Sequence, residues 1–230
     1  MQNKKIRQAI KGMVSVNKVV EDKGIPNSSI LPNSIYLSET TNWKGVIVED
    51  LLADENITVK NPLKITLTFD NQGEHKEIAD SLQRSLSRSD LFQITQNPVT
   101  WQDLLGLREQ KQFQMIRSGW CADYPDIMQF LTLFHSKSPD NKISYKHAKV
   151  DQLLEQLENT DLVSTERQNL IDQVVQQLEK DVVILPLFQY QQKIALEPSI
   201  KGIDKNNSSG VIYSKDLYRE LPTNNKQTTQ

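Results

Sequence analysis

The sequence predicts an α/β fold in which a mixed sheet is flanked by helices. Residues 63–69 alternate Leu, Ile, Leu and Phe with Lys and Thr, the period of a strand with one buried face. Ile78, Leu82 and Leu86 then recur at the spacing of one helix face. Two further strand-like segments follow with a helical segment between them, an alternation typical of a sheet built with crossover connections.

The N-terminal region predicts one helix followed by an irregular connection. Asn3 can cap a helix over residues 3–20, because its side-chain oxygen can accept from the free amides of the first turn. Gly24 and Pro26 should end this helix. The following stretch to residue 43 is rich in Pro, Asn and Ser, which predicts little regular structure.

The central region predicts the strands and helices of the sheet. The turn-forming residues 70–73 should end the first strand, and a helix over 74–88 should follow. A strand over 91–96 should end at Asn97 and Pro98. Thr100, with an acidic residue three positions later, predicts the start of the next helix, and residues 112–117 predict a third strand.

The C-terminal half predicts a helix over 127–134 and two amphipathic helices, the second capped by Thr165 and Gln168. The apolar run 182–188 predicts a buried strand, and 191–196 a neighbouring one. Residues 1–221 are expected to form one lobe. Residues 222–230 contain no apolar side chain, so this tail is expected to be disordered.

Composition excludes several classes of function. A net charge of −2 and a pI near 6.0 give no reason to expect nucleic acid as a partner. No run approaches the roughly 20 apolar residues of a membrane span. The single cysteine, Cys121, excludes an internal disulfide. The N-terminal residues are basic but lack the apolar core of a secretory signal, so no signal peptide is expected in this chain.

The usual signatures of catalysis and cofactor binding are not found in the sequence, so we expect neither an enzyme nor a cofactor. A metal site near His135, Asp140 and His147 is conceivable. Solvated surface histidines are the favoured interpretation, because none lies at ligand spacing on a helix. A small α/β enzyme that uses Cys121 or Asp123 remains a weaker alternative.

The loop 117–124 concentrates groups that could bind a ligand: a cation, a glycine, two aromatic rings, a thiol and a carboxylate. His75 follows the strand 63–69, and Asp123 follows the strand 112–117. If both strands are parallel, these residues face one crevice, because ligands bind beyond the carboxyl ends of such strands. In the alternative interpretation, Trp120 and Tyr124 fill the core and Asp123 caps the next helix.

The same loop carries a resemblance to a known family. RSGWCADYPD, residues 117–126, is similar to the R-x-G-W-x-A-D-Y stretch of oligopeptide-binding proteins of bacterial ABC importers, solute-binding protein family 5. Weaker resemblances lie at residues 5–10, 62–65, 73–76, 179–188 and 216–218. Together they cover nearly the whole chain and resemble the C-terminal lobe, the third domain, of these periplasmic proteins.

The resemblance implies a lobe of the class II periplasmic-binding fold, which closes with a second, N-terminal lobe on an extended oligopeptide. Asp123 would pair with the peptide α-ammonium and Trp120 would wall the cleft. His75 and Arg108 would meet the C-terminal carboxylate. The full set of ligand-binding residues expected from the resemblance is Asp123, Trp120, Cys121, Arg117, Arg108, His75 and Tyr190. The expected partners are the peptide, the other lobe and the membrane subunits of the ABC transporter, and the full-length parent would be periplasmic.

The chain departs from the family pattern, and one rival assignment stays open. Family members are more than twice as long, and Gln189 stands where an aromatic residue is usual. In some family members, the cysteine of this loop is bridged to one that would lie upstream of Met1. The same lobe also serves as a ligand-sensing domain in some bacterial transcriptional regulators. A DNA-binding segment upstream of Met1 would favour a sensor, and a secretory signal would favour a transporter.

We expect Cys121 to be a free thiol in this chain, because it is the only cysteine. Titration of the unfolded chain with a thiol reagent should find one reactive group per molecule. A chain with no reactive group would contradict this expectation.

Overall fold

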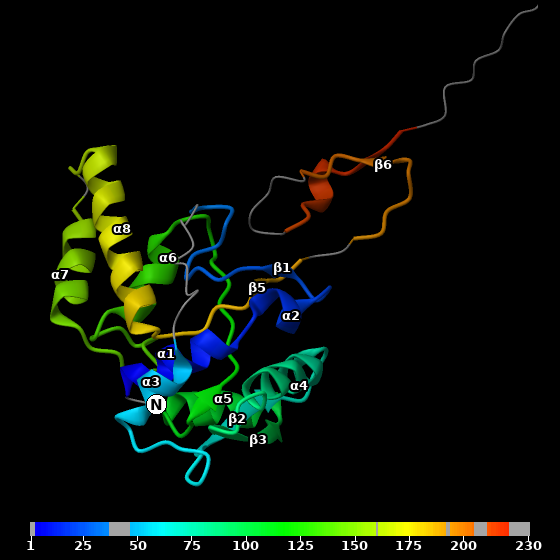
Figure 1. Ribbon diagram of the computed structural model, residues 1–230. Helices are drawn as coiled ribbons and strands as arrows, with labels where there is room; N and C mark the ends of the chain where they lie inside the picture. Colours follow the sequence, from blue (N-terminus) through cyan, green and yellow to red (C-terminus); the bar gives the residue numbers. More distant parts are fainter. Residues whose placement is uncertain (1–2, 37–46, 160, 192–193, 205–210, 221–230) are drawn as a thin grey trace, which may run out of the picture.

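The computed structural model describes residues 3–36, 47–159, 161–191, 194–204 and 211–220. It contains a parallel sheet in the order β3–β2–β4, made of β2 Leu63–Asp70, β3 Phe92–Val99 and β4 Met115–Ile116. Figure 1 shows β2 and β3 side by side. The predicted α/β class and crossover connections are confirmed. The antiparallel pairs lie apart from this sheet, in two small ribbons.

The strands differ from the prediction at their ends. β2 and β3 pair in parallel from Leu63 opposite Phe92 to Asp70 opposite Val99, so β3 continues through Pro98 and the predicted end at Asn97 is wrong. Proline is tolerated there because β3 is an edge strand. β4 is shorter than the predicted 112–117, because the Gln114 side chain accepts from the Thr66 amide, at 2.7 Å, beside the short ladder.

Helices α4 His75–Leu86 and α5 Trp101–Glu109 connect the strands, and the predicted cap of α5 is confirmed. The Thr100 hydroxyl accepts from the Asp103 amide at 3.1 Å. At the N-terminus, Asn3 caps α1 Lys4–Met13 by accepting from the Lys5 amide at 2.9 Å. The single helix predicted over 3–20 is instead two, because Val14 and Ser15 are extended between α1 and α2 Val16–Val20.

A helical layer lies beside the sheet and contains α7 Ala148–Leu157 and α8 Ser164–Asp181 (Figure 1). The helix predicted over 127–134 is split into α6 Met128–Leu131 and the 3₁₀ turn η1 Thr132–Phe134. The predicted Thr165–Gln168 capping box is wrong. The N-cap of α8 is Val163, two residues before Thr165, and the Glu166 carboxylate accepts from the Val163 amide at 3.4 Å.

The buried strand predicted over 182–188 is wrong. Val182 has φ 46° and ends α8, and only β5 Phe188–Gln189 is extended and paired. It pairs antiparallel with β1 Ile25–Pro26. Gly24 is required beside this ribbon, since a Cβ there would lie 2.4 Å from the Phe188 ring. The described part of 191–196 contains no strand.

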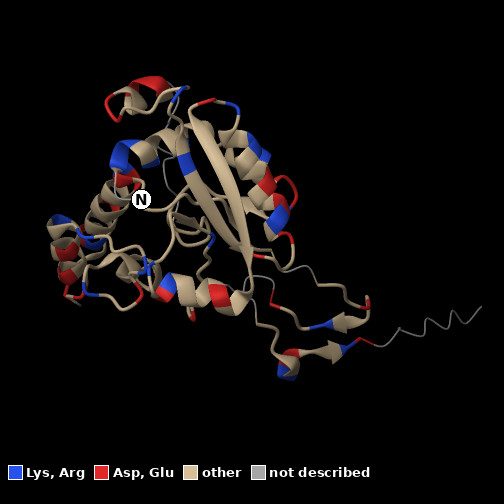
Figure 2. Cartoon of the chain, turned by 90° about the horizontal axis from the view of Figure 1, so that it is seen from below, with Lys and Arg blue, Asp and Glu red and all other residues tan. Residues whose placement is uncertain are grey.

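The remaining elements form short helical turns or a separate arm. α3 Val48–Ala53 packs against α1. β6 Ile200–Lys201 and β7 Tyr218–Arg219 pair antiparallel, and with η2 Ser214–Asp216 they stand to one side of the body in both views (Figures 1 and 2). The predicted tail 222–230 lies outside the described residues. Within the described ranges, no helix has the length and apolar character needed to cross a bilayer.

Two apolar clusters form the core. The first joins the sheet to α1, α3 and α4 and includes Leu52, Phe69 and Leu86. The second joins α6, α7 and α8 and includes Leu154 and Leu178. Figure 2 shows acidic and basic residues interspersed along the helices of the described chain, the charge pattern of a solvated surface.

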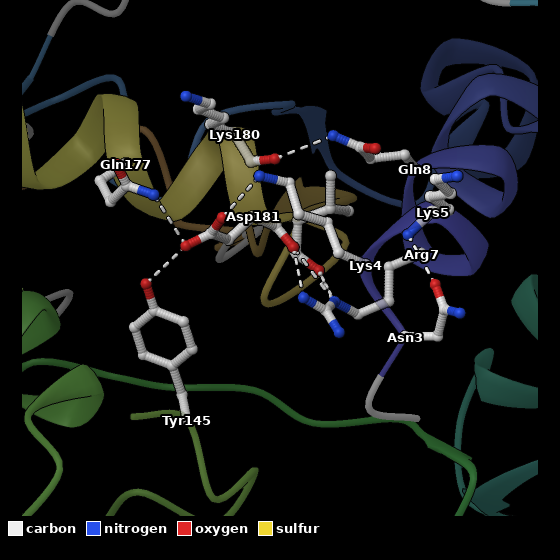
Figure 3. A network of polar contacts seen from close by, with 10 residues as sticks. Asn3, Lys4, Lys5, Arg7, Gln8, Tyr145, Gln177, Lys180 and Asp181 are labelled. Carbon is white, nitrogen blue, oxygen red and sulfur yellow. Dashed lines mark hydrogen bonds and ion pairs between the residues drawn. The ribbon is translucent and has the colours of Figure 1, made fainter. Parts of the chain in front are cut away.

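Polar contacts at the C-terminal end of α8 connect the two clusters (Figure 3). The buried Asp181 carboxylate accepts from Lys4 at 2.9 Å, Tyr145 at 2.8 Å and Gln177 at 2.9 Å. The Arg7 guanidinium donates to the carbonyls of Asp181 and Val182 at 2.7 and 2.9 Å. A cation is favourable there because these carbonyls form the negative end of the helix dipole.

Burial raises the pKa of the Asp181 carboxyl, but hydrogen bonds from Lys4, Gln177 and Tyr145 outweigh that effect and hold the pKa below its ordinary value of 3.8. A carboxyl with a depressed pKa in the folded state stabilises the fold above its unfolded pKa. This stabilisation is lost as the pH falls through the folded pKa.

We predict that Asp181→Asn lowers the free energy of unfolding at neutral pH by about 1–3 kcal/mol, because buried donors lose a charged acceptor. The difference from wild type should shrink as the pH falls from 3.8 through the lower pKa of the folded state, where the wild-type carboxyl becomes protonated. Urea unfolding at several pH values measures both effects. Asp161→Asn is the matched control, since this residue is exposed. Equal stabilities of Asp181→Asn and the control would contradict the prediction.

Candidate functional site

An open hollow lies at the carboxyl ends of β2 and β4. Its volume is about 370 Å³, and its lining residues are Asp70, Gln72, His75, Trp101, Arg117 and Tyr190. This is the end of a parallel sheet where ligands bind. Three of the sequence-predicted residues, His75, Arg117 and Tyr190, therefore come together here.

Asp70 forms the floor of the hollow. It is the last residue of β2, and its side chain is only 1% exposed. One carboxylate oxygen meets His75 Nδ1 at 2.7 Å, and the other accepts from Arg117 Nη1 at 3.0 Å. A buried charge is tolerated when it is paired and hydrogen-bonded in this way. Asp70 thereby fixes the positions of both the imidazole ring and the guanidinium group.

Tyr190 lines the hollow from a segment that is far from the other lining residues in sequence. It follows β5, and its ring packs edge-on against Phe188 with the centroids 4.8 Å apart. Its hydroxyl lies 3.2 Å from His75 Nε2 and also bonds Arg117 Nη2. The β1–β5 ribbon thus carries a side chain to the end of the sheet, 115 residues beyond His75 in sequence.

The loop after Arg117 presents its aromatic side chains to the surface. Trp120 is 42% exposed and Tyr124 is 55% exposed, so the alternative in which they fill the core is wrong. Gly119 lies against the Tyr190 ring, since a Cβ there would be 3.9 Å from that ring. Cys121 is an exposed free thiol. The loop therefore adjoins the hollow and extends its surface.

Asp123 lies in this loop and is exposed. Its backbone amide donates to Gln129 Oε1 at 3.2 Å, and no described residue bonds its carboxylate. The alternative in which it caps the next helix is wrong. Asp126 contacts the start of the helix instead, since its carboxylate accepts from the Met128 amide at 2.7 Å. The Asp123 carboxylate is free to meet another molecule.

Arg108 lies behind the loop. From the last turn of α5, its guanidinium donates to Ser118 Oγ at 3.2 Å. Its Nε is buried and has no hydrogen-bond partner among the described groups. Arg108 therefore holds the start of the loop and is not one of the residues that line the hollow.

Sequence reasoning missed Asp70, Gln72 and Trp101. The sequence predicts Asp70 and Gln72 as turn residues that end a strand, and Trp101 as part of a helix. A signal was present for Asp70, because a carboxylate in the last position of an apolar parallel strand is costly to bury without a partner. The approach of Arg117 from another strand supplies that partner.

The two other histidines have structural contacts. His147 caps α7 by accepting from the Val150 amide, at 3.4 Å. His135 lies 3.6 Å from Glu155 and accepts from the Lys137 amide. Across the described ranges, His, Cys, Asp and Glu do not gather into a group of three or more that could hold a metal ion.

Comparison with known proteins agrees with this architecture. The family model "Bacterial extracellular solute-binding proteins, family 5 Middle" matches residues 1–142. The chain belongs to this family. It is a family of solute-binding proteins, so membership points to binding.

Relatives match almost all of the chain. A Haemophilus influenzae protein described only as a binding protein is 40% identical over 225 residues, which is 96% of this chain and 43% of that protein. The periplasmic oligopeptide-binding protein OppA of Salmonella typhimurium is 27% identical, with 93% and 41% covered. The chain thus spans about two fifths of the length of these relatives.

A solved structure shares the fold. OppA of Burkholderia pseudomallei superposes with a TM-score of 0.83 over 95% of this chain and 46% of its own, at 24% identity. This confirms the predicted class of periplasmic-binding lobe, since the shared region includes nearly every described element.

We predict that Asp70→Asn lowers the free energy of unfolding by about 1–3 kcal/mol, because an amide cannot accept from Arg117 and His75 at once. Urea unfolding at neutral pH measures this. The exposed Asp161→Asn variant carries the same change in charge and should be close to wild type. If Asp70→Asn matched that control, the buried pairing would not exist in solution.

Proposed function

We propose that this chain is the C-terminal lobe of a periplasmic protein that binds oligopeptides for an ABC importer. The observation that carries the proposal is the free carboxylate of Asp123, beside the exposed ring of Trp120, in a loop that adjoins the hollow lined by Arg117 and His75. The family match and the printed name of the Salmonella relative support it.

The two ends of a peptide have opposite charges, and this surface offers a partner for each. The Asp123 carboxylate is suited to the α-ammonium group, because ionised acceptors form the stronger class of hydrogen bond. Arg117 lies in the hollow and is suited to the carboxylate end, since guanidinium binds carboxylates in a planar fork. Trp120 supplies an apolar wall along the loop.

The proposed roles of the arginines differ from those that the family resemblance implied. Arg117, and not Arg108, is the arginine that shares the hollow with His75. We therefore assign the carboxylate contact to Arg117 and His75. Arg108 acts by holding Ser118, and so positions the loop that carries Asp123.

We further propose that residues 1–221 form one lobe and that a second lobe of a longer protein completes the site. The hollow has an open side. The arm built from β6, β7 and η2 carries exposed Val211, Tyr213 and Tyr218. In the proposed two-lobed protein, the second lobe would cover these groups. The ABC transporter membrane subunits would receive the peptide from the complete two-lobed protein, in the periplasm.

The proposal predicts weak binding by the lobe alone, because half of the contacts are missing and water reaches the site. Isothermal titration of trialanine into the 230-residue chain should give an affinity weaker than micromolar. The product of the whole reading frame that contains this chain should bind the same peptide at micromolar concentrations. Micromolar binding by the 230-residue chain would contradict the half-site proposal.

Asp123→Asn in the longer protein should weaken trialanine binding by about 2–5 kcal/mol, because the ammonium group loses its charged partner. This corresponds to roughly a 30-fold to several-thousandfold rise in Kd. Asp140→Asn is the matched control, since Asp140 is also exposed and lies outside the loop. An unchanged affinity of Asp123→Asn would remove Asp123 from the site.

A further inference from the structure

The hydrogen bonds around His75 accommodate its neutral form. The Asp70 carboxylate can only accept, so His75 Nδ1 must carry the proton in their 2.7 Å bond. In a neutral imidazole, Nε2 is then an acceptor. With His75 neutral, the Tyr190 hydroxyl, 3.2 Å away, can donate to Nε2 while it accepts from Arg117 Nη2. Arg117 Nη1 bonds Asp70 and closes a ring of four residues.

With His75 neutral, this ring has no net charge and leaves none of its facing groups unsatisfied. Asp70 contributes one negative charge, Arg117 one positive charge, and His75 and Tyr190 none. The Tyr190 hydroxyl suits the ring because it can donate and accept at once. A ligand carboxylate can only accept. In the place of this hydroxyl it could bond Arg117, but it would face the lone pair of His75 Nε2.

We propose that Tyr190 closes the neutral hollow, and that a ligand carboxylate replaces its hydroxyl only together with the uptake of one proton by His75. Protonated His75 donates from both nitrogens, to Asp70 on one side and to the ligand on the other. Tyr190 keeps its own proton and turns outward. This movement is possible because its side chain is already 58% exposed. The proposal rests on the proposed carboxylate contact of Arg117 and His75, and adds its regulation by pH.

The surroundings of His75 favour this exchange. The charged or titratable groups that meet its ring are Asp70 from β2, Arg117 after β4 and Tyr190 after β5. Its neighbours on α4 are engaged elsewhere, Lys76 with Asp80 and Glu77 with Lys23. The imidazolium form would therefore stand between two carboxylates, those of Asp70 and the ligand.

Acetate is the probe, because it is a carboxylate that needs neither Asp123 nor a second lobe. It stays ionised between about pH 6 and about pH 8, whereas imidazole groups change charge in this range. NMR titration of the 230-residue chain, observed at the His75 ring, measures the affinity. We expect it to fall by up to about tenfold per pH unit across this range, the limit for one linked proton.

Three variants separate the parts of the proposal. Tyr190→Phe should bind acetate more tightly than wild type at each pH, because the competing hydroxyl is gone, and should keep the pH dependence. His75→Gln, observed at the backbone amide of Arg117, should lose the pH dependence. Tyr124→Phe removes an exposed tyrosine hydroxyl outside the hollow and should behave as wild type.

Acetate binding by these variants tests the role of Tyr190 and His75 separately from peptide binding. Tighter and pH-dependent binding by Tyr190→Phe supports it, even if trialanine binds neither chain. Equal or weaker binding by Tyr190→Phe overturns it, since the hydroxyl would then not be a competitor. Failure of Tyr190→Phe to bind acetate at tens of millimolar, or binding that ignores pH, overturns it as well.

Discussion

The contact of Arg7 with the end of α8 is the constraint on which the rest of the structure depends. It joins residues 174 positions apart and closes the N-terminal helix onto the C-terminal end of the longest helix. The Arg7 guanidinium meets two carbonyls that have no partner within the helix, and Asp181 gathers Lys4, Tyr145 and Gln177 beside them (Figure 3). The sheet cluster and the helical cluster are thereby fixed relative to each other.

The functional surface follows from this contact. Because α8 ends at Val182, the chain leaves the helical layer there, runs beside α1 and reaches β1. The β1–β5 ribbon then sets Tyr190 over the end of β2. The polar groups of the hollow are thus supplied by three segments far apart in sequence. Asp70 is buried at their junction, and so contributes both to stability and to the geometry of the site.

The elements that the sequence predicts well are those with long internal periodicity. β2, α4, α7 and α8 show it over eight or more residues, and local caps such as Asn3 and Thr100 mark helix starts. The short ribbons have no such signal, since two paired residues cannot show a period. The run 182–188 looked like a strand because apolar composition alone does not distinguish a strand from an irregular buried segment.

The candidate site, like the fold, could be predicted only where it depends on local signals in the sequence. His75 and Arg117 could be placed because each follows a strand, and the carboxyl ends of parallel strands meet. Asp70 and the orientation of Tyr190 could not, because both depend on contacts made across the fold. The sequence also does not distinguish Asp123 from Asp126 at the start of the helix, since both precede it. Only the geometry shows that Asp126 bonds the Met128 amide.

The two proposed ends of the ligand site differ in rigidity. Arg117 and His75 are fixed by a buried carboxylate at the end of a paired strand, so their positions are set by the sheet. Asp123 sits in a loop held by a bond from Arg108 to Ser118 and by a bond to Gln129. A rigid anchor at one end and an adjustable one at the other suits ligands that share end charges but differ in length. In the proposed site, the loop would accommodate differences in ligand length, while the proposed protonation of His75 would control whether the carboxylate end binds.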